Sequence, residues 1–157
     1  MRRRKEKQHI ILPDPKFGQV DVTKFVNNLM LDGKKSLAYD IFYDAIAIVD
    51  EKSGEEENGL DVWRKAVVNI TPGVEVRSRR VGGATFQIPT PVRDSRKESL
   101  AIKWLITASR KRNEKTMSQK LAAEILAGAK EEGAAYKKKE DTHRMAEANK
   151  AFSHFRF

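Results

Sequence analysis

Apolar side chains recur at spacings of three and four residues along most of this chain, which predicts amphipathic helices. The first helix is expected to begin at an N-cap Asp21 and to stop at Gly33, and helices over about 36–52 and 60–70 follow, the last ended by Pro72-Gly73. Their apolar stripes are Val22, Phe25, Val26, Leu29 and Met30; Leu37, Ile41, Ala45, Ile48 and Val49; and Leu60, Trp63, Val67 and Ile70.

The period then changes from about 3.6 to 2. Val74 and Val76 alternate with Glu75 and Arg77, and a second alternating run contains Phe86 and Ile88. Gly82-Gly83 lies between the two runs, which predicts a β-hairpin over about 74–89. Strand packing is the expected role of Phe86. A two-stranded hairpin is marginally stable alone, so it should lie against a partner or carry a function at its tip.

Helical spacing resumes after the hairpin. A fourth helix is expected over about 93–111, with Leu100, Trp104, Leu105 and Ala108 on its stripe. Thr116 and Gln119 have the spacing of a capping box and predict the start of a fifth helix, which should end near Gly133. A sixth is expected over about 137–152, with Met145, Ala148 and Phe152 along it. Trp63 and Trp104 are predicted to be core residues.

These patterns predict a mainly α fold, a six-helix bundle-like domain with one projecting β-hairpin inserted between helices 3 and 4. Residues 1–18 have no periodicity and contain Pro13 and Pro15, so they are expected to form an extended basic RNA-binding arm. Residues 19–157 would then be a single helical rRNA-binding domain, because a chain of 157 residues is long enough for one domain with one core.

Composition excludes several classes of protein. Without cysteine, the chain cannot be a disulfide scaffold, hold a Cys-ligated zinc or use a thiol nucleophile. No apolar run approaches the roughly 20 residues of a membrane span, and the basic start lacks the apolar stretch of a signal peptide. A soluble, cytoplasmic protein is expected.

The net charge of +9 is distributed unevenly. Residues 1–60 carry 10 basic and 11 acidic side chains, whereas residues 61–157 carry 21 basic and 11 acidic ones. Carboxylates concentrate between Asp40 and Asp61, where Lys52 is the only cation. One face is therefore predicted to meet a polyanion, and the acidic segment is expected to face solvent or a basic neighbouring protein.

Seven basic clusters, most of them at loops and element ends, are the strongest functional signal. Cations at exposed ends can reach phosphates without burying a charge, and arginine can grip phosphate with two donors. The chain lacks the exposed aromatic pair of an RNA-recognition sheet, so we expect binding to folded RNA by shape and phosphate. The predicted contact residues are Arg2, Arg3, Arg4, Lys5, Lys34, Lys35, Arg77, Arg79, Arg80, Arg93, Arg96, Lys97, Arg110, Lys111, Arg112, Lys115, Lys137, Lys138, Lys139 and Arg144, with Lys150 in the last cluster.

Residues that could support catalysis are few. His9, His143 and His154 lack the spacing of a helical zinc pair, and no nucleophile elbow or P-loop is present. The run Glu55-Glu56-Glu57 is interpreted as a solvated loop, because nothing spaces its carboxylates around one cation. We therefore predict no enzyme activity, no cofactor, no metal and no small-molecule substrate.

Several motifs together resemble the family of small ribosomal subunit protein seven in its bacterial form. They lie in order along nearly the whole chain: Leu29-Met30, Gly33-Lys34-Lys35, Ile41-Phe42 and Ala45; Arg79-Arg80-Val81-Gly82-Gly83 with Gln87-Ile88-Pro89; Trp104 with Ala108-Ser109-Arg110-Lys111-Arg112; and the run from His143 to Phe152. Glu55-Glu56-Glu57 departs from the family by its acidity.

The resemblance implies a structural constituent of the small ribosomal subunit. It implies a primary 16S rRNA-binding protein that nucleates assembly of the subunit head (the 3′ major domain) and sits at the subunit interface near the exit site. The hairpin, at Arg79, Arg80, Val81, Gly82 and Gly83, would lie close to exit-site tRNA and mRNA. Small-subunit proteins nine and eleven would be neighbours, and some bacterial members repress translation of their own message.

Two other classes stay open at this point. A stand-alone regulator could bind one mRNA operator or DNA. A DNA-binding recognition helix is typically rich in Asn, Gln and Arg on one exposed face, whereas the fourth helix has Arg96 and Lys103 but little else. A nuclease would need paired carboxylates or histidines in a basic cleft, and no convincing pair is spaced for it.

Overall fold

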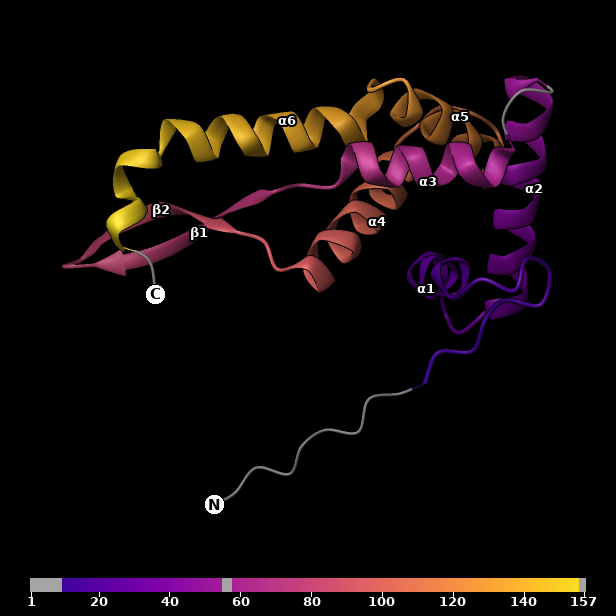
Figure 1. Cartoon of the computed structure of the whole chain (residues 1–157), viewed down its shortest axis with the longest axis horizontal. Helices are drawn as coiled ribbons and strands as arrows, with labels where there is room; N and C mark the ends of the chain where they lie inside the picture. The colour runs from indigo at the N-terminus through magenta and orange to yellow at the C-terminus, as the bar shows by residue number, and fades with distance from the viewer. Residues whose placement is uncertain (1–9, 55–57, 156–157) are drawn as a thin grey trace, which may run out of the picture.

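The computed structural model describes residues 10–54 and 58–155, and in it a two-stranded hairpin projects from one end of a group of packed helices (Figure 1). The elements, in chain order, are α1 Val20–Leu29, α2 Lys35–Ser53, α3 Gly59–Ile70, β1 Val74–Val81, β2 Ala84–Pro91, α4 Asp94–Arg110, α5 Met117–Ala129, α6 Gly133–Ala148 and the 3₁₀ helix η1 Lys150–Phe155. The predicted class, six helices with one hairpin between the third and fourth, is confirmed. Residues 1–9, part of the predicted arm, lie outside the described residues, as do Glu55-Glu56-Glu57.

The core lies where the first five helices meet. Phe25, Phe42 and Trp63, from α1, α2 and α3, form an aromatic cluster with ring centroids 5.3 to 5.6 Å apart. Leu105 of α4 and Ile125 of α5 are fully buried in the same cluster. Because each helix contributes a narrow apolar stripe, no helix could bury its stripe alone, and the helices fold as one unit.

Asp14 holds the chain against the helices just before α1 begins. Its buried carboxylate accepts hydrogen bonds from the amides of Lys16, Phe17 and Gln19 at 3.2, 2.9 and 2.8 Å, and from the Tyr43 hydroxyl at 3.0 Å. Burial and the bond to Asp14 raise the pKa of Tyr43 to about 12. The described end of the predicted arm is therefore a turn anchored on α2.

Replacing Asp14 with asparagine should lower the free energy of unfolding by about 1–2 kcal/mol near neutral pH, because an amide has one acceptor oxygen where the carboxylate has two. Burial acts to raise the pKa of Asp14, but the four hydrogen bonds outweigh it and hold this pKa below the usual 3.8. The carboxylate therefore stabilises the fold above that value, and its contribution disappears as the pH falls through the lowered pKa. Urea unfolding at about pH 6 and about pH 2.5 should show the gap between wild type and Asp14→Asn narrowing at the lower pH. A gap that stays constant would contradict this.

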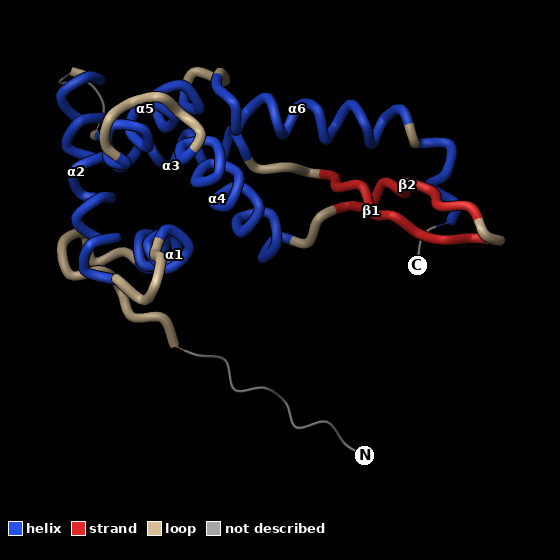
Figure 2. The backbone as a smooth tube through the Cα atoms, turned by 180° about the vertical axis from the view of Figure 1, so that it is seen from behind, coloured by secondary structure: helices blue, strands red, loops and turns tan. Residues whose placement is uncertain are grey.

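The hairpin has the predicted turn and a partner to lie against. Val81 pairs with Ala84 across Gly82-Gly83, and these glycines have φ of 56° and 90°, which a two-residue hairpin turn of this type requires. α6 runs alongside the hairpin, and η1 folds over it (Figure 2). Phe86 packs against Phe152 of η1 with ring centroids 5.2 Å apart, which confirms its packing role.

Three details predicted near the first helices were wrong. α1 ends at Leu29, four residues before the predicted stop at Gly33. The N-cap position of α1 is Gln19, and Asp21 lies in the first turn. The amide of Gln19 is already bonded to Asp14, so the chain enters α1 two residues earlier than local capping suggested. In α2 the buried stripe is Ala38, Phe42, Ala45, Ile46 and Val49, and Leu37 is 53% exposed. Apolar residues occur on more than one face of α2, so spacing alone did not select the inner one.

The boundary between the last two long helices also differs from the prediction. Gly133, predicted to end the fifth helix, is the first residue of α6, and α5 ends at Ala129. Gly133 has φ of 89°, and a Cβ there would come within 2.9 Å of a Glu124 carboxylate oxygen. α6 ends at Ala148, before the predicted 152, and Met145 is 46% exposed. The buried face of α6 carries small residues, such as Ala146. A search for large apolar residues at helical spacing does not detect such a face.

Candidate nucleic-acid interface

The predicted RNA-contacting cations are spread over the ends of several elements. Among described residues they occupy the start of α2 and the loop before it, β1 of the hairpin, the start of α4, the loop after α4, and α6. Arg2, Arg3, Arg4 and Lys5 lie outside the described residues. These positions make no single cleft, so the candidate interface is a distributed surface of cations.

Hydrogen bonds and ion pairs within the chain divide most of these cations into two groups; Lys35 instead lies 5.8 Å from the centroid of the Tyr39 ring, and Arg79 is in neither group. One group is engaged with carboxylates or main-chain carbonyls: Lys34, Arg77, Arg96, Lys97, Arg110, Arg112 and Lys139. In the described part of the chain, no polar partner is found for a second, exposed group: Arg80, Arg93, Lys111, Lys115, Lys137, Lys138 and Arg144. We call these seven residues the free cations.

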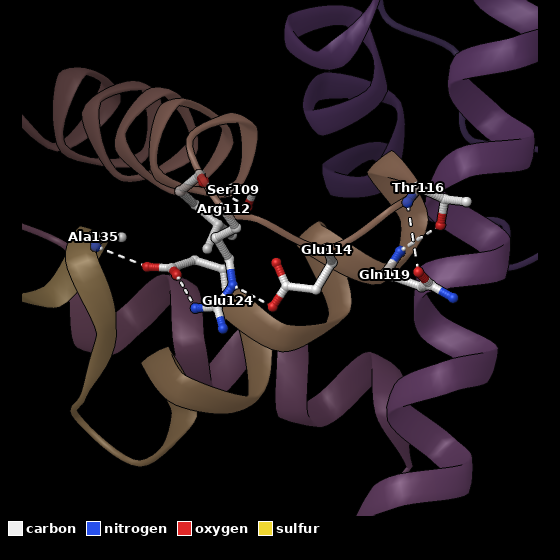
Figure 3. Close-up of polar contacts among 8 residues, drawn as sticks. Ser109, Arg112, Glu114, Thr116, Gln119, Glu124 and Ala135 are labelled. Atoms are coloured by element: carbon white, nitrogen blue, oxygen red, sulfur yellow. Dashed lines mark hydrogen bonds and ion pairs between the residues drawn. The ribbon is translucent and has the colours of Figure 1, made fainter.

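Arg112 is held at the centre of a polar cluster below the loop between α4 and α5 (Figure 3). It donates to the fully buried Glu124 at 2.8 Å and to Glu114 at 3.0 Å. These bonds raise the pKa of Arg112, the bond to Glu124 most strongly. The other oxygen of Glu124 accepts from the amide of Ala135 at 2.8 Å, in the first turn of α6. The cluster thus joins the basic loop after α4 to α5 and α6.

The same loop ends in the predicted capping box. Thr116 accepts from the amide of Gln119 at 3.3 Å, and the Gln119 side chain accepts from the amide of Thr116 (Figure 3). The box satisfies amides that α5 leaves without helical partners. Lys115, a free cation, is therefore carried on a loop fixed at both ends.

Glu75 ties the base of the hairpin to α4. Strand alternation predicts that Glu75 points outward, but it is only 8% exposed and bonds Arg96 at 2.9 Å and Arg77 at 2.6 Å. Burial acts to raise the pKa of Glu75, and the bonds from Arg96 and Arg77 outweigh it, so the pKa is lowered. Two predicted RNA ligands are thus engaged in positioning the hairpin.

Replacing Glu75 with glutamine should lower the free energy of unfolding by about 1–2 kcal/mol, because both arginines are about half exposed and water screens the pairs. The two released guanidinium groups should also steepen the salt dependence of non-specific RNA binding by about 1–2 units. Urea unfolding and a salt titration with an unrelated RNA measure the two effects. Glu98→Gln, which breaks the pair with Lys24, is the matched control and should change both little, because the Glu98 side chain is 38% accessible where that of Glu75 is 11%. If Glu75→Gln and Glu98→Gln had equal effects, Glu75 would not be the residue that holds the two arginines and the base of the hairpin.

Two other predicted cations stabilise helix ends. Arg110 donates to the carbonyl of Leu29 at the end of α1 at 3.1 Å. Lys139 donates to the carbonyl of Asn69 near the end of α3 at 2.8 Å, and the Asn69 amide donates to the carbonyls of Gly128 and Ala129 at 3.0 and 3.1 Å. Carbonyls at helix ends lack helical partners and carry partial negative charge, so cations are favoured there.

The acidic surface lies mainly on α2. Asp40, Asp44 and Glu51 are exposed, and no hydrogen bond or ion pair joins them to other described residues. Asp50 is different, because it accepts a hydrogen bond from the amide of Gly59 and so closes the connection between α2 and α3. What the acidic surface faces in an assembly stays a prediction.

The two described histidines, His143 and His154, each bond a main-chain group. Nε2 of His143 accepts a hydrogen bond from the amide of Gly73 at 3.1 Å, and Nδ1 of His154 lies 2.9 Å from the carbonyl of Ala151. Within residues 10–54 and 58–155, no three His, Asp or Glu side chains are grouped to hold a metal ion. No helix in this part of the chain is long and apolar enough to cross a membrane.

Comparison with known proteins agrees with the predicted resemblance. Residues 1–150 match the family model described as ribosomal protein S7p/S5e. Proteins named small ribosomal subunit protein uS7 are similar over their full lengths and over all of this chain: 68% identical in Christiangramia forsetii, 64% in Cytophaga hutchinsonii and 60% in Porphyromonas gingivalis. The match covers the helices, the hairpin and the positions of every free cation. The chain therefore belongs to the ribosomal protein S7p/S5e family.

Proposed function

We propose that this chain is a structural, non-enzymatic constituent of the small ribosomal subunit that binds 16S rRNA and nucleates folding of the subunit head. The observation that carries the proposal is the family match over residues 1–150. The free cations support it, since they are exposed side chains on a packed helical body, whereas seven other predicted RNA ligands are engaged within the chain. Residues 1–9, rich in arginine, would add phosphate contacts.

The proposed mechanism is charge neutralisation by a preformed scaffold. Phosphates of neighbouring RNA helices repel one another, and cations fixed on one protein surface offset that repulsion where the helices meet. Because Arg112 and Glu124 join the loop after α4 to α5 and α6, the backbone that carries the cations of this loop and of α6 is in place before RNA arrives. Binding then costs less conformational entropy.

The finer parts of the proposal concern the ribosomal environment. They are a position at the subunit interface near the exit site, a hairpin close to exit-site tRNA and mRNA, contacts with small-subunit proteins nine and eleven, a cytoplasmic location, and repression of the chain's own message. The hairpin supports them in one respect: its tip projects away from the helices and is free to approach a ligand (Figure 1). Its arginines at the tip, Arg79 and Arg80, are the residues to test.

The test is binding to a 16S rRNA fragment of the head domain beside an unrelated structured RNA of equal length, at about 0.2 M salt. A preference on the order of 10³ or more for the head fragment is expected. Equal binding to both RNAs would overturn the proposal and favour the regulator class. Cleavage of labelled RNA with magnesium present would show a nuclease instead. A DNA-reading role is weakened in advance, because Arg96 is bonded to Glu75.

A further inference from the structure

A shallow groove runs between α4 and α6, lined by Trp104, Thr107, Ala108, Lys111, Ala134 and Lys138. Trp104, Thr107 and Ala108 lie at helical spacing on one face of α4, and Lys111 is the C-cap residue that follows its last residue, Arg110. Trp104 is half-buried against the core and turns part of its indole to the groove. Helical spacing predicts Trp104 in the core, and the fold also places it beside Lys111, seven residues further along.

The charge of the groove has one sign. Lys111 and Lys138 are exposed free cations on opposite walls, and no carboxylate is among the lining residues. Ala134 lies in the first turn of α6, where main-chain amides and the helix dipole add positive potential. The buried carboxylate near this turn, Glu124, is bonded to the next amide, that of Ala135. The groove is thus complementary to a small anion bound beside a flat ring.

We infer that this groove takes one unpaired nucleotide of RNA, with its base against the indole of Trp104 and its phosphate between the ammonium groups of Lys111 and Lys138. The inference rests on the proposed function and deepens it by naming where a single nucleotide is held. An unpaired base can stack on an aromatic side chain, which a base inside a helix cannot do. The indole is held by the core, so it is positioned for stacking before RNA binds.

Fluorescence gives a direct test, because the chain has two tryptophans and Trp63 is buried in the core. The difference in emission between wild type and Trp104→Phe isolates the signal of Trp104. Adding the head rRNA fragment should quench that difference signal, since a stacked base quenches indole emission. Trp104→Leu should weaken RNA binding by about 5- to 150-fold, and Trp104→Phe by less.

The lysines supply a second test that does not disturb the core. Lys111→Gln with Lys138→Gln should reduce the slope of log affinity against log salt by about 0.7–0.9, because the two lysines share one phosphate. Lys103→Gln with Lys130→Gln, two exposed lysines outside the groove, is the matched control and should change it little. Urea unfolding checks that each variant is folded; if Trp104→Leu is not, the Trp104→Phe difference signal and the lysine pairs still decide.

The outcomes separate this inference from the proposed function. Unchanged Trp104 emission at saturating head RNA, with the wild-type preference intact, would overturn the inference alone. The inference alone would also be overturned if the Lys111→Gln, Lys138→Gln variant bound the head RNA as tightly as the Lys103→Gln, Lys130→Gln control. Equal quenching by head RNA and unrelated RNA would support a nucleotide site but overturn the proposed specificity.

Discussion

Replacing Glu124 with alanine is expected to lower the free energy of unfolding by about 3 kcal/mol, a large part of the stability of a domain of this size. The carboxylate is fully buried, and its removal would leave the buried Ala135 amide without its acceptor and the Arg112 guanidinium with Glu114 alone. A buried donor without an acceptor costs about 1–3 kcal/mol, and more if it is charged. The cavity left by the side chain adds to this destabilisation.

Two further variants separate the causes. Glu124→Gln keeps an oxygen for the Ala135 amide and nearly fills the same volume, so it should lose only part of that stability. Glu114→Gln removes the more exposed acceptor of Arg112, whose side chain is 32% accessible, and should cost less than about 1 kcal/mol. Urea unfolding followed by far-UV circular dichroism measures all three. If Glu124→Ala were no worse than Glu114→Gln, the buried cluster would not be what joins the helices.

Neutralising four free cations together should lower affinity for the head rRNA fragment by about 100- to 1,000-fold at about 0.2 M salt. The variant carries Arg80→Gln, Arg93→Gln, Lys115→Gln and Lys137→Gln. Each phosphate that the protein no longer neutralises should also reduce the slope of log affinity against log salt by about 0.7–0.9. The free energy of unfolding should change little, because these side chains have no polar partners in the described part of the chain.

A matched control removes the same total charge elsewhere. Lys52, Lys65, Lys103 and Lys130 are exposed, and none is among the predicted RNA ligands. Their joint replacement by glutamine should reduce affinity by less than about 10-fold, through net charge alone. Equal reductions in the two variants, measured by filter binding over a range of salt, would mean that total charge matters and that the free cations mark no interface.

The free cations could not have been identified without the fold. In the sequence, Arg112 and Lys111 are neighbours of equal promise as phosphate ligands. The structure bonds Arg112 to the buried Glu124 and leaves Lys111 exposed in the groove. Nothing in the sequence around Glu124 predicted that it is buried, because a carboxylate beside an apolar stripe is ordinarily exposed. Its burial depends on a cation from another element.

The sequence by itself determined the number of α-helices, the hairpin and its turn, the capping box and the family. Such features depend on residues within a few positions of one another, as with Thr116 and Gln119 or with Gly82-Gly83. Tertiary structure alone decided which face of α2 is buried, where α6 begins and which cations are engaged. The deciding partners lie far apart in the chain: Arg96 is 21 residues from Glu75, Lys139 is 70 from Asn69 and Arg110 is 81 from Leu29. The spacing of residues along the chain cannot predict these interactions, because they form only when the helices pack together.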